Sequence, residues 1–129
     1  MSIAYWCLFV AAALPYIWVG LSRAGLGRYD NHDPRGWSAA QTHPRAKRGY
    51  AAHLNAFEAF APFAAGVLAA QAAGVDPGRI ATLSVAFIVC RILHGVFYLA
   101  DLHAFRSFSW MGGFGCVLAL LAQAALKAA

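Results

Sequence analysis

The sequence predicts an all-α integral membrane protein, a bundle of four membrane-spanning helices that forms one domain. Hydrophobic residues make up 61% of the 129 residues and charged residues only 12%, whereas charged residues are about 25% of a typical soluble domain. The mean hydropathy is +0.57. Four segments approach the ~20 apolar residues that a helix needs to cross a bilayer core. The composition excludes a disordered chain and a soluble domain with a polar surface.

The first apolar segment covers residues 3–22, and no Lys or Arg precedes it. It is too long and too aromatic for the apolar region of a signal peptide, so we expect a retained first span. The polar stretch 23–49 follows, and its glycines and prolines prevent a continuous helix. These residues are Gly25, Gly27, Pro34, Gly36 and Pro44.

The other three spans are predicted over residues 50–73, 80–100 and 108–126. Spans two and three carry ionisable residues, which a strict filter for uncharged segments would reject. In the tight turn before span three, Asp76 is the predicted N-cap and Pro77 the first helical residue. A short polar link joins spans three and four.

The basic residues lie mostly on one side of the predicted bundle. The first and third loops hold seven Lys and Arg, whereas the other side holds two, Arg79 and Lys127. The positive-inside rule then places the first and third loops in the cytoplasm and both termini outside. Six of the ten basic residues lie in one loop between apolar spans, so we interpret the net charge of +5 as an orientation signal and expect no nucleic-acid partner. The alanine-rich composition suggests a bacterial inner membrane.

Other residue types point to structural roles. The three cysteines lie inside apolar segments with no metal-ligand spacing, and we interpret them as packing residues. The His and Asp residues of the first loop lack a fourth ligand, so no metal site is predicted. Trp37 and Trp110 are expected to lie at the membrane interfaces.

Polar residues within spans two and three predict an interior site. An ionisable side chain inside a span costs about 2.5–3.5 kcal/mol and usually marks a functional site. Asn55 and Glu58 are three residues apart and share a helix face. Arg91, His94 and Tyr98 also share one face. Because Glu58 and Arg91 have similar predicted depths, we expect a direct ion pair between them; the alternative interpretation is that the cluster only holds the helices together.

Two runs of sequence resemble the MAPEG family, the membrane-associated proteins of eicosanoid and glutathione metabolism. The runs are HLNAFEAFAPF at 53–63 and RILHGVFYLADLHAFRSFSW at 91–110. The four-span layout with a long cytoplasmic first loop is also similar. The resemblance implies a homotrimer that binds glutathione between adjacent subunits, near the cytoplasmic side.

The resemblance also implies roles for single residues. Asn55 and Glu58 match positions that contact glutathione or support its site. Arg91, His94 and Tyr98 match the site residues of span three. A lipophilic second substrate would enter from the bilayer.

Arg106 matches the arginine that is thought to stabilise the glutathione thiolate, and it is the implied catalytic residue. The sequence departs from the family pattern at Ala51, where an arginine is frequent, and at Ala59, where an aromatic residue is frequent. Arg48, one turn before Ala51, is the expected substitute for the missing arginine in glutathione binding.

These observations favour a glutathione-dependent membrane transferase or peroxidase that acts on lipophilic electrophiles or lipid hydroperoxides. One alternative is a non-catalytic MAPEG-like protein that binds lipid. Another is a small proton-coupled exporter that uses Glu58. Arg106 distinguishes the enzyme from the non-catalytic lipid-binding protein, because only the enzyme requires a residue that stabilises a thiolate.

Overall fold

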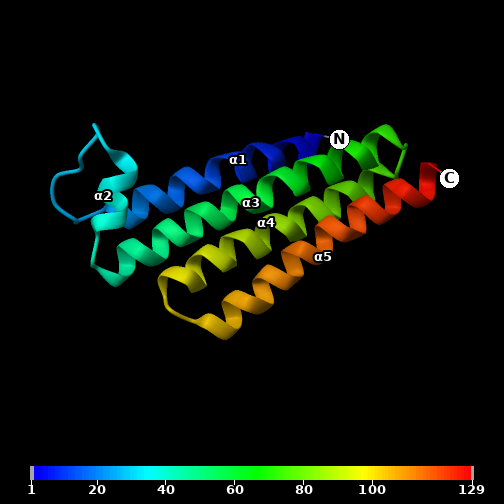
Figure 1. Cartoon of the computed structure of the whole chain (residues 1–129). Coiled ribbons are helices and arrows are strands. Elements are labelled where there is room, and N and C mark those ends of the chain that lie inside the picture. The colour runs from blue at the N-terminus through cyan, green and yellow to red at the C-terminus, as the bar shows by residue number, and fades with distance from the viewer. Residues whose placement is uncertain (1, 129) are drawn as a thin grey trace.

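The computed structural model describes residues 2–128, and this range contains five helices and no strand. The helices are α1 (Ser2–Arg23), α2 (Pro34–Ala40), α3 (Pro44–Ala72), α4 (Pro77–Leu99) and α5 (His103–Ala128). The four long helices run side by side as an elongated bundle (Figure 1). The short helix α2 and the α4–α5 turn lie at one end, whereas α1 begins and α5 ends at the other.

Helix α3 is the central element of the bundle. It packs along α1 and also contacts α2, α4 and α5. Helix α4 packs mainly against α5. Helix α3 therefore lies next to both α4 and α5.

Aromatic rings and small residues form the core. Phe63 of α3 and Phe87 of α4 are almost fully buried, and their rings stack with centroids 3.9 Å apart. Gly95 leaves room for the Trp18 side chain, against which a Cβ atom would collide. Gly49 leaves similar room for Ser22. Small residues at such contacts allow the close helix approach that membrane bundles use.

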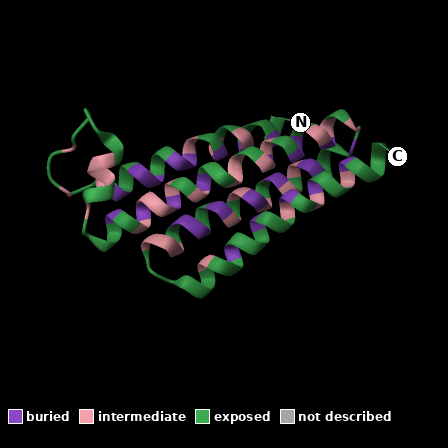
Figure 2. Ribbon diagram, in the orientation of Figure 1, coloured by how far each residue is buried: buried purple, intermediate pink, exposed green. Residues whose placement is uncertain are grey.

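The outer surface of the bundle is apolar. Many large hydrophobic side chains are exposed, among them Trp6, Phe9 and Phe108. Figure 2 shows that exposed residues follow the outward faces of all the long helices. Arg91 and His94, by contrast, are buried. A polar interior beneath an apolar surface is the arrangement that a bilayer favours.

Several helix boundaries differ from the predicted ones. Helix α3 begins at Pro44 rather than at residue 50, because the His43 ring accepts a hydrogen bond from the Arg45 N–H at 3.2 Å and caps the helix there. Helix α5 begins at His103 rather than at 108. The N-cap at Asp76 is confirmed, since its carboxylate accepts the Arg79 N–H at 3.0 Å.

Helix α2 lies in the stretch that was expected to lack a continuous helix. Asp33 caps it by accepting the Gly36 N–H at 2.9 Å, and Pro34 is its first residue. The Trp37 indole N–H donates to the Arg28 carbonyl at 3.0 Å. This contact folds the first loop back on itself.

Three helices within the described range, α1, α4 and α5, are long and apolar enough to cross a membrane. The sequence predicted four such spans, but the fourth long helix, α3, is not among the helices that qualify by length and composition. Helix α3 has 29 residues, which at about 1.5 Å per residue exceeds a bilayer core. Its first half carries the charged residues Arg45, Lys47, Arg48 and Glu58. Because of these charges, α3 is not among the helices that are apolar enough to cross a membrane.

Candidate functional site

Two neighbouring cavities lie among α3, α4 and α5. The first, here called the inner cavity, has a volume of about 150 Å³. The second, the outer cavity, has a volume of about 340 Å³. Asn55 and Trp110 line both cavities, so the two spaces adjoin.

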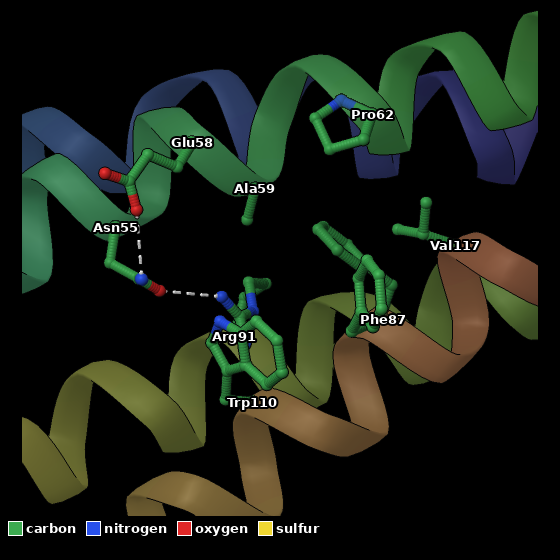
Figure 3. A pocket seen from close by; sticks show the side chains of 9 residues that line it. Asn55, Glu58, Ala59, Pro62, Phe87, Arg91, Trp110 and Val117 are labelled. Carbon is green, nitrogen blue, oxygen red and sulfur yellow. Dashed lines mark hydrogen bonds between the residues drawn. The ribbon is translucent and has the colours of Figure 1, made fainter.

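The inner cavity has a polar side and an apolar side (Figure 3). The polar side is formed by Asn55, Glu58 and Arg91. The apolar side is formed by Ala59, Pro62, Phe87, Phe114 and Val117. Pro62 lies inside α3 and has no N–H, so it cannot donate the helical hydrogen bond to the Glu58 carbonyl.

A chain of hydrogen bonds links the polar residues of the inner cavity. The Asn55 amide nitrogen donates to the Glu58 carboxylate at 3.2 Å, and Arg91 Nη1 donates to the Asn55 amide oxygen at 3.1 Å (Figure 3). The predicted direct ion pair between Glu58 and Arg91 is therefore wrong: the structure shows no such pair. An amide side chain both donates and accepts, so Asn55 separates the two charges and bonds to each.

Arg91 is the most deeply buried of the three polar residues that line the inner cavity. Its side chain is 4% exposed, and its Nε and Nη2 atoms have no hydrogen-bond partner among the described residues. Its guanidinium carbon lies 5.8 Å from the Phe87 ring centroid, within range of a cation–π interaction. Gly113 of α5 lies alongside, where a Cβ atom would approach Nε to 3.1 Å. The glycine thus allows α5 to close over the guanidinium group.

The outer cavity brings together three of the predicted site residues, His94, Tyr98 and Arg106. The Arg106 guanidinium carbon lies 4.5 Å from the Tyr98 ring centroid. The His94 ring meets the Tyr98 ring edge to face, with centroids 5.3 Å apart. His94 and Tyr98 come from the last turns of α4 and Arg106 from the first turn of α5, so the α4–α5 turn positions this group.

Arg48 lies apart from the other predicted site residues. Its Nη1 atom pairs with the Asp101 carboxylate at 2.9 Å, which joins the start of α3 to the α4–α5 turn. Arg48 is not among the residues that line either cavity. The structure therefore brings six of the seven predicted residues together around the two cavities, and Arg48 is the one that lines neither of them.

Sequence reasoning missed several residues that line the cavities. Trp110, assigned to a membrane interface, lines both of them, and Phe114 and Val117 line the inner one. The spacing Arg106, Trp110, Phe114, Val117 follows one helix face. This periodicity could have predicted them, because it places the three apolar residues on the same face of α5 as the predicted catalytic arginine, in the turns that follow it.

The site combines cations, hydrogen-bond donors and an apolar surface. Arginine binds carboxylates through paired N–H donors, and Arg91 has two donors without a partner. A nearby cation also favours a thiolate over a thiol. The residues present therefore fit a small anionic peptide with a thiol, beside an apolar compound.

Comparison with protein families identifies one match. The model of the MAPEG family matches residues 3–126 of the chain. No curated protein and no solved structure gives a significant match.

Proposed function

The chain belongs to the MAPEG family, and we propose that it is a glutathione-dependent membrane transferase or peroxidase acting on lipophilic electrophiles or lipid hydroperoxides. The observation that carries the proposal is the outer cavity. There Arg106 lies over the Tyr98 ring beside His94. A cation, a phenol and an imidazole share one space next to an apolar cavity.

Glutathione is the co-substrate in this proposal, and each of its groups has a partner in the cluster. Its amine suits the Glu58 carboxylate, which is exposed and accepts one hydrogen bond, from Asn55. Its carboxylates suit arginine. Arg91, with two unpartnered donors, supplies positive charge at the centre of the cluster. Arg48 would contribute at the start of α3, where a substrate carboxylate competes with Asp101 for the guanidinium group.

Arg106 is the proposed catalytic residue, because its charge stabilises the glutathione thiolate. In a transferase, the thiolate sulfur forms a bond to the electrophilic carbon, and the leaving group departs with the bonding electron pair. In a peroxidase, two glutathione molecules reduce one hydroperoxide, which yields one disulfide, one alcohol and one water. Both reactions need the glutathione thiolate, so one measurement of thiolate formation tests both of them.

Thiolate formation is the first prediction. Glutathione is titrated into detergent-purified protein at neutral pH, and the ultraviolet absorbance of the thiolate is followed. We expect a saturable signal for the wild type. Arg106→Ala should lose it, and Arg79→Ala should keep it, because Arg79 lies at the opposite end of the bundle. Arg106→Lys should retain part of the signal, since a positive charge remains.

A wild-type signal that survives in Arg106→Ala would remove the catalytic assignment. A folded wild-type protein with no saturable signal would remove the glutathione proposal altogether. The non-catalytic lipid-binding function would then take its place, with Ala51 and Ala59 as the residues that mark the loss of glutathione binding.

A further inference from the structure

Another cavity, here called the terminal cavity, lies at the end of the bundle opposite to the α4–α5 turn. Its volume is about 670 Å³, and it is lined by the α3–α4 turn and the last turns of α5, which Figure 1 shows together at that end. In the turn, Gly74 has a φ of +74°, which glycine adopts without strain. The Val75 N–H then donates to the Ala70 carbonyl at 2.9 Å. Backbone hydrogen bonding therefore holds one wall of the cavity.

Both basic residues at this end of the bundle line the terminal cavity. Arg79 comes from the first turn of α4 and Lys127 from the last turn of α5. Neither side chain forms an ion pair within residues 2–128. Asp76 also lines the cavity, but its carboxylate caps α4 by accepting the Arg79 backbone N–H at 3.0 Å. The two cations and one carboxylate leave an excess of positive charge, which favours an anionic ligand.

Gln123 adds a hydrogen-bond acceptor to this cavity. It lies on α5, one turn before Lys127, and lines the cavity. Its Oε1 atom is buried and has no hydrogen-bond partner among the described residues. A buried acceptor without a partner is unfavourable, so a ligand that supplies a donor is favoured here. Together, the cations and the amide oxygen suit an anion that also carries a hydroxyl group.

Apolar side chains adjoin the charged part of the terminal cavity. A neighbouring cavity of about 400 Å³ shares three of its lining residues, Asp76, Arg79 and Gln123. This neighbouring cavity continues along α4 to Leu83, one turn deeper in the bundle than Arg79. On the other side, Leu126 lines the terminal cavity and is 81% exposed. Charged groups next to exposed apolar surface suit a ligand with a polar head and a hydrocarbon chain.

The lengths of the helices place this cavity at the membrane surface. Helix α4 has 23 residues, which corresponds to about 34 Å, and a bilayer core is about 30 Å thick. Arg79 lies in the first turn of this helix, and Lys127 lies in the last turn of α5. Both cations therefore lie at the level of the lipid headgroups.

We propose that the terminal cavity binds the headgroup of one anionic phospholipid from the surrounding bilayer. The lipid phosphate lies between Arg79 and Lys127, and a headgroup hydroxyl donates to Gln123 Oε1. One acyl chain follows α4 past Leu83. A phosphoglycerol headgroup has this combination of a single negative charge and free hydroxyl groups. The site shares no residue with the proposed glutathione site.

Native mass spectrometry of detergent-purified protein, titrated with dioleoyl phosphatidylglycerol, tests the two cations. We expect saturable binding to the wild type. A double variant, Arg79→Gln with Lys127→Gln, should bind about thirtyfold more weakly, because each cation near an anionic headgroup contributes roughly fivefold in affinity. The matched control is Arg35→Gln with Lys47→Gln, which removes the same charges from exposed positions at the opposite end. It should bind the lipid as the wild type does.

A second comparison tests the contact with the headgroup hydroxyl. Dioleoyl phosphatidylmethanol carries the same charge as phosphatidylglycerol but has no hydroxyl in its headgroup. The wild type should bind phosphatidylglycerol more tightly than phosphatidylmethanol. Gln123→Leu should bind the two lipids equally well, because the acceptor is gone while both cations remain. A preference that survives in Gln123→Leu would remove the proposed role of Gln123.

Three outcomes would overturn the lipid site. Equal weakening of binding in the two double variants would indicate a general attraction between basic residues and anionic lipid. Binding of dioleoyl phosphatidylethanolamine as tight as that of phosphatidylglycerol would contradict the anionic headgroup. Competition by glycerol 1-phosphate at the concentration of the lipid would show that the cavity takes a soluble phosphate ester instead. Glutathione is absent throughout, so a failure of the thiolate titration leaves these results unchanged.

Discussion

Asn55 determines how the charges inside the bundle are arranged. It lies three residues before Glu58 and faces Arg91 of α4. It donates to the carboxylate and accepts from the guanidinium group. In a direct ion pair, the Glu58 carboxylate would be bound to the Arg91 guanidinium group. With the Asn55 amide between them, the carboxylate stays available to a ligand. The geometry thus separates a buried cation from an exposed anion.

Truncation of Asn55 should therefore be more damaging than truncation of Glu58. Hydrogen bonds to charged groups contribute about 1.5–3 kcal/mol each, so we expect Asn55→Ala to lower the free energy of unfolding by about 2–3 kcal/mol. Glu58→Ala should have a smaller effect, because that carboxylate is exposed and bonds to Asn55 rather than to Arg91. Thermal unfolding in detergent, followed by helical circular dichroism, ranks the two variants. A larger loss for Glu58→Ala would indicate a direct interaction with Arg91.

The sequence predicted the members of this cluster but not their contacts. Helical spacing placed Asn55 and Glu58 on one face and Arg91 and His94 on another, and the structure brings these faces together. Which side chain lies between the two charges depends on rotamers and on the crossing of α3 and α4. Periodicity within one helix contains no information on that crossing, so the bridging role of Asn55 was not predictable.

At the scale of helices, the contact between α1 and α4 depends on one glycine. Trp18 of α1 is 5% exposed, and its ring occupies the space where Gly95 has no side chain. Overpacking a well-filled interior costs about 1–3 kcal/mol. A methyl group at position 95 cannot be accommodated unless the large ring moves.

We expect Gly95→Ala to lower the free energy of unfolding by about 1–3 kcal/mol. Gly115→Ala is the matched control, because nothing lies within 4 Å of a Cβ atom at that position. It should leave stability unchanged or raise it slightly, since alanine favours helix by up to about 1 kcal/mol over glycine. Chemical denaturation in mixed micelles compares the two variants. Equal stability of both would show that the Trp18 ring does not occupy the space at position 95.

Some helix boundaries were predictable and others were not. Asp76 and Pro77 predicted the start of α4 because both signals lie next to a long apolar segment. The same pair of residue types, Asp33 and Pro34, begins α2, but no apolar segment follows to mark a helix. Helix α2 also depends on the contact of Trp37 with a carbonyl nine residues earlier, which no local pattern reveals.

At the scale of the whole molecule, the position of α3 compensates for its polarity. It lies along α1 and connects the α2 end of the bundle to the opposite end. We propose that it crosses the bilayer with the other three long helices, its polar face covered by α4 and α5. Glu58 remains exposed in the single chain. We therefore also propose that adjacent copies, in a homotrimer, cover this face.

The distribution of charge predicts the orientation of this bundle in the membrane. Seven of the Lys and Arg residues lie at the end that holds α2 and the α4–α5 turn, and two lie at the other end. Cytoplasmic loops carry the excess of Lys and Arg. We therefore expect α2 on the cytoplasmic side and the end of α5 outside. The outer cavity, which lies beside the α4–α5 turn, would then open toward cytoplasmic glutathione.

Two matched variants test this orientation, Ala40→Cys at the end of α2 and Ala128→Cys at the end of α5, both at exposed alanines. They are treated with a membrane-impermeant maleimide in bacterial spheroplasts. Ala128→Cys should react in intact spheroplasts, whereas Ala40→Cys should react only after permeabilisation. The unsubstituted protein is the control, because its three cysteines lie within α1, α4 and α5. The reverse pattern would place Arg106 outside and separate the proposed thiolate site from the cytoplasm.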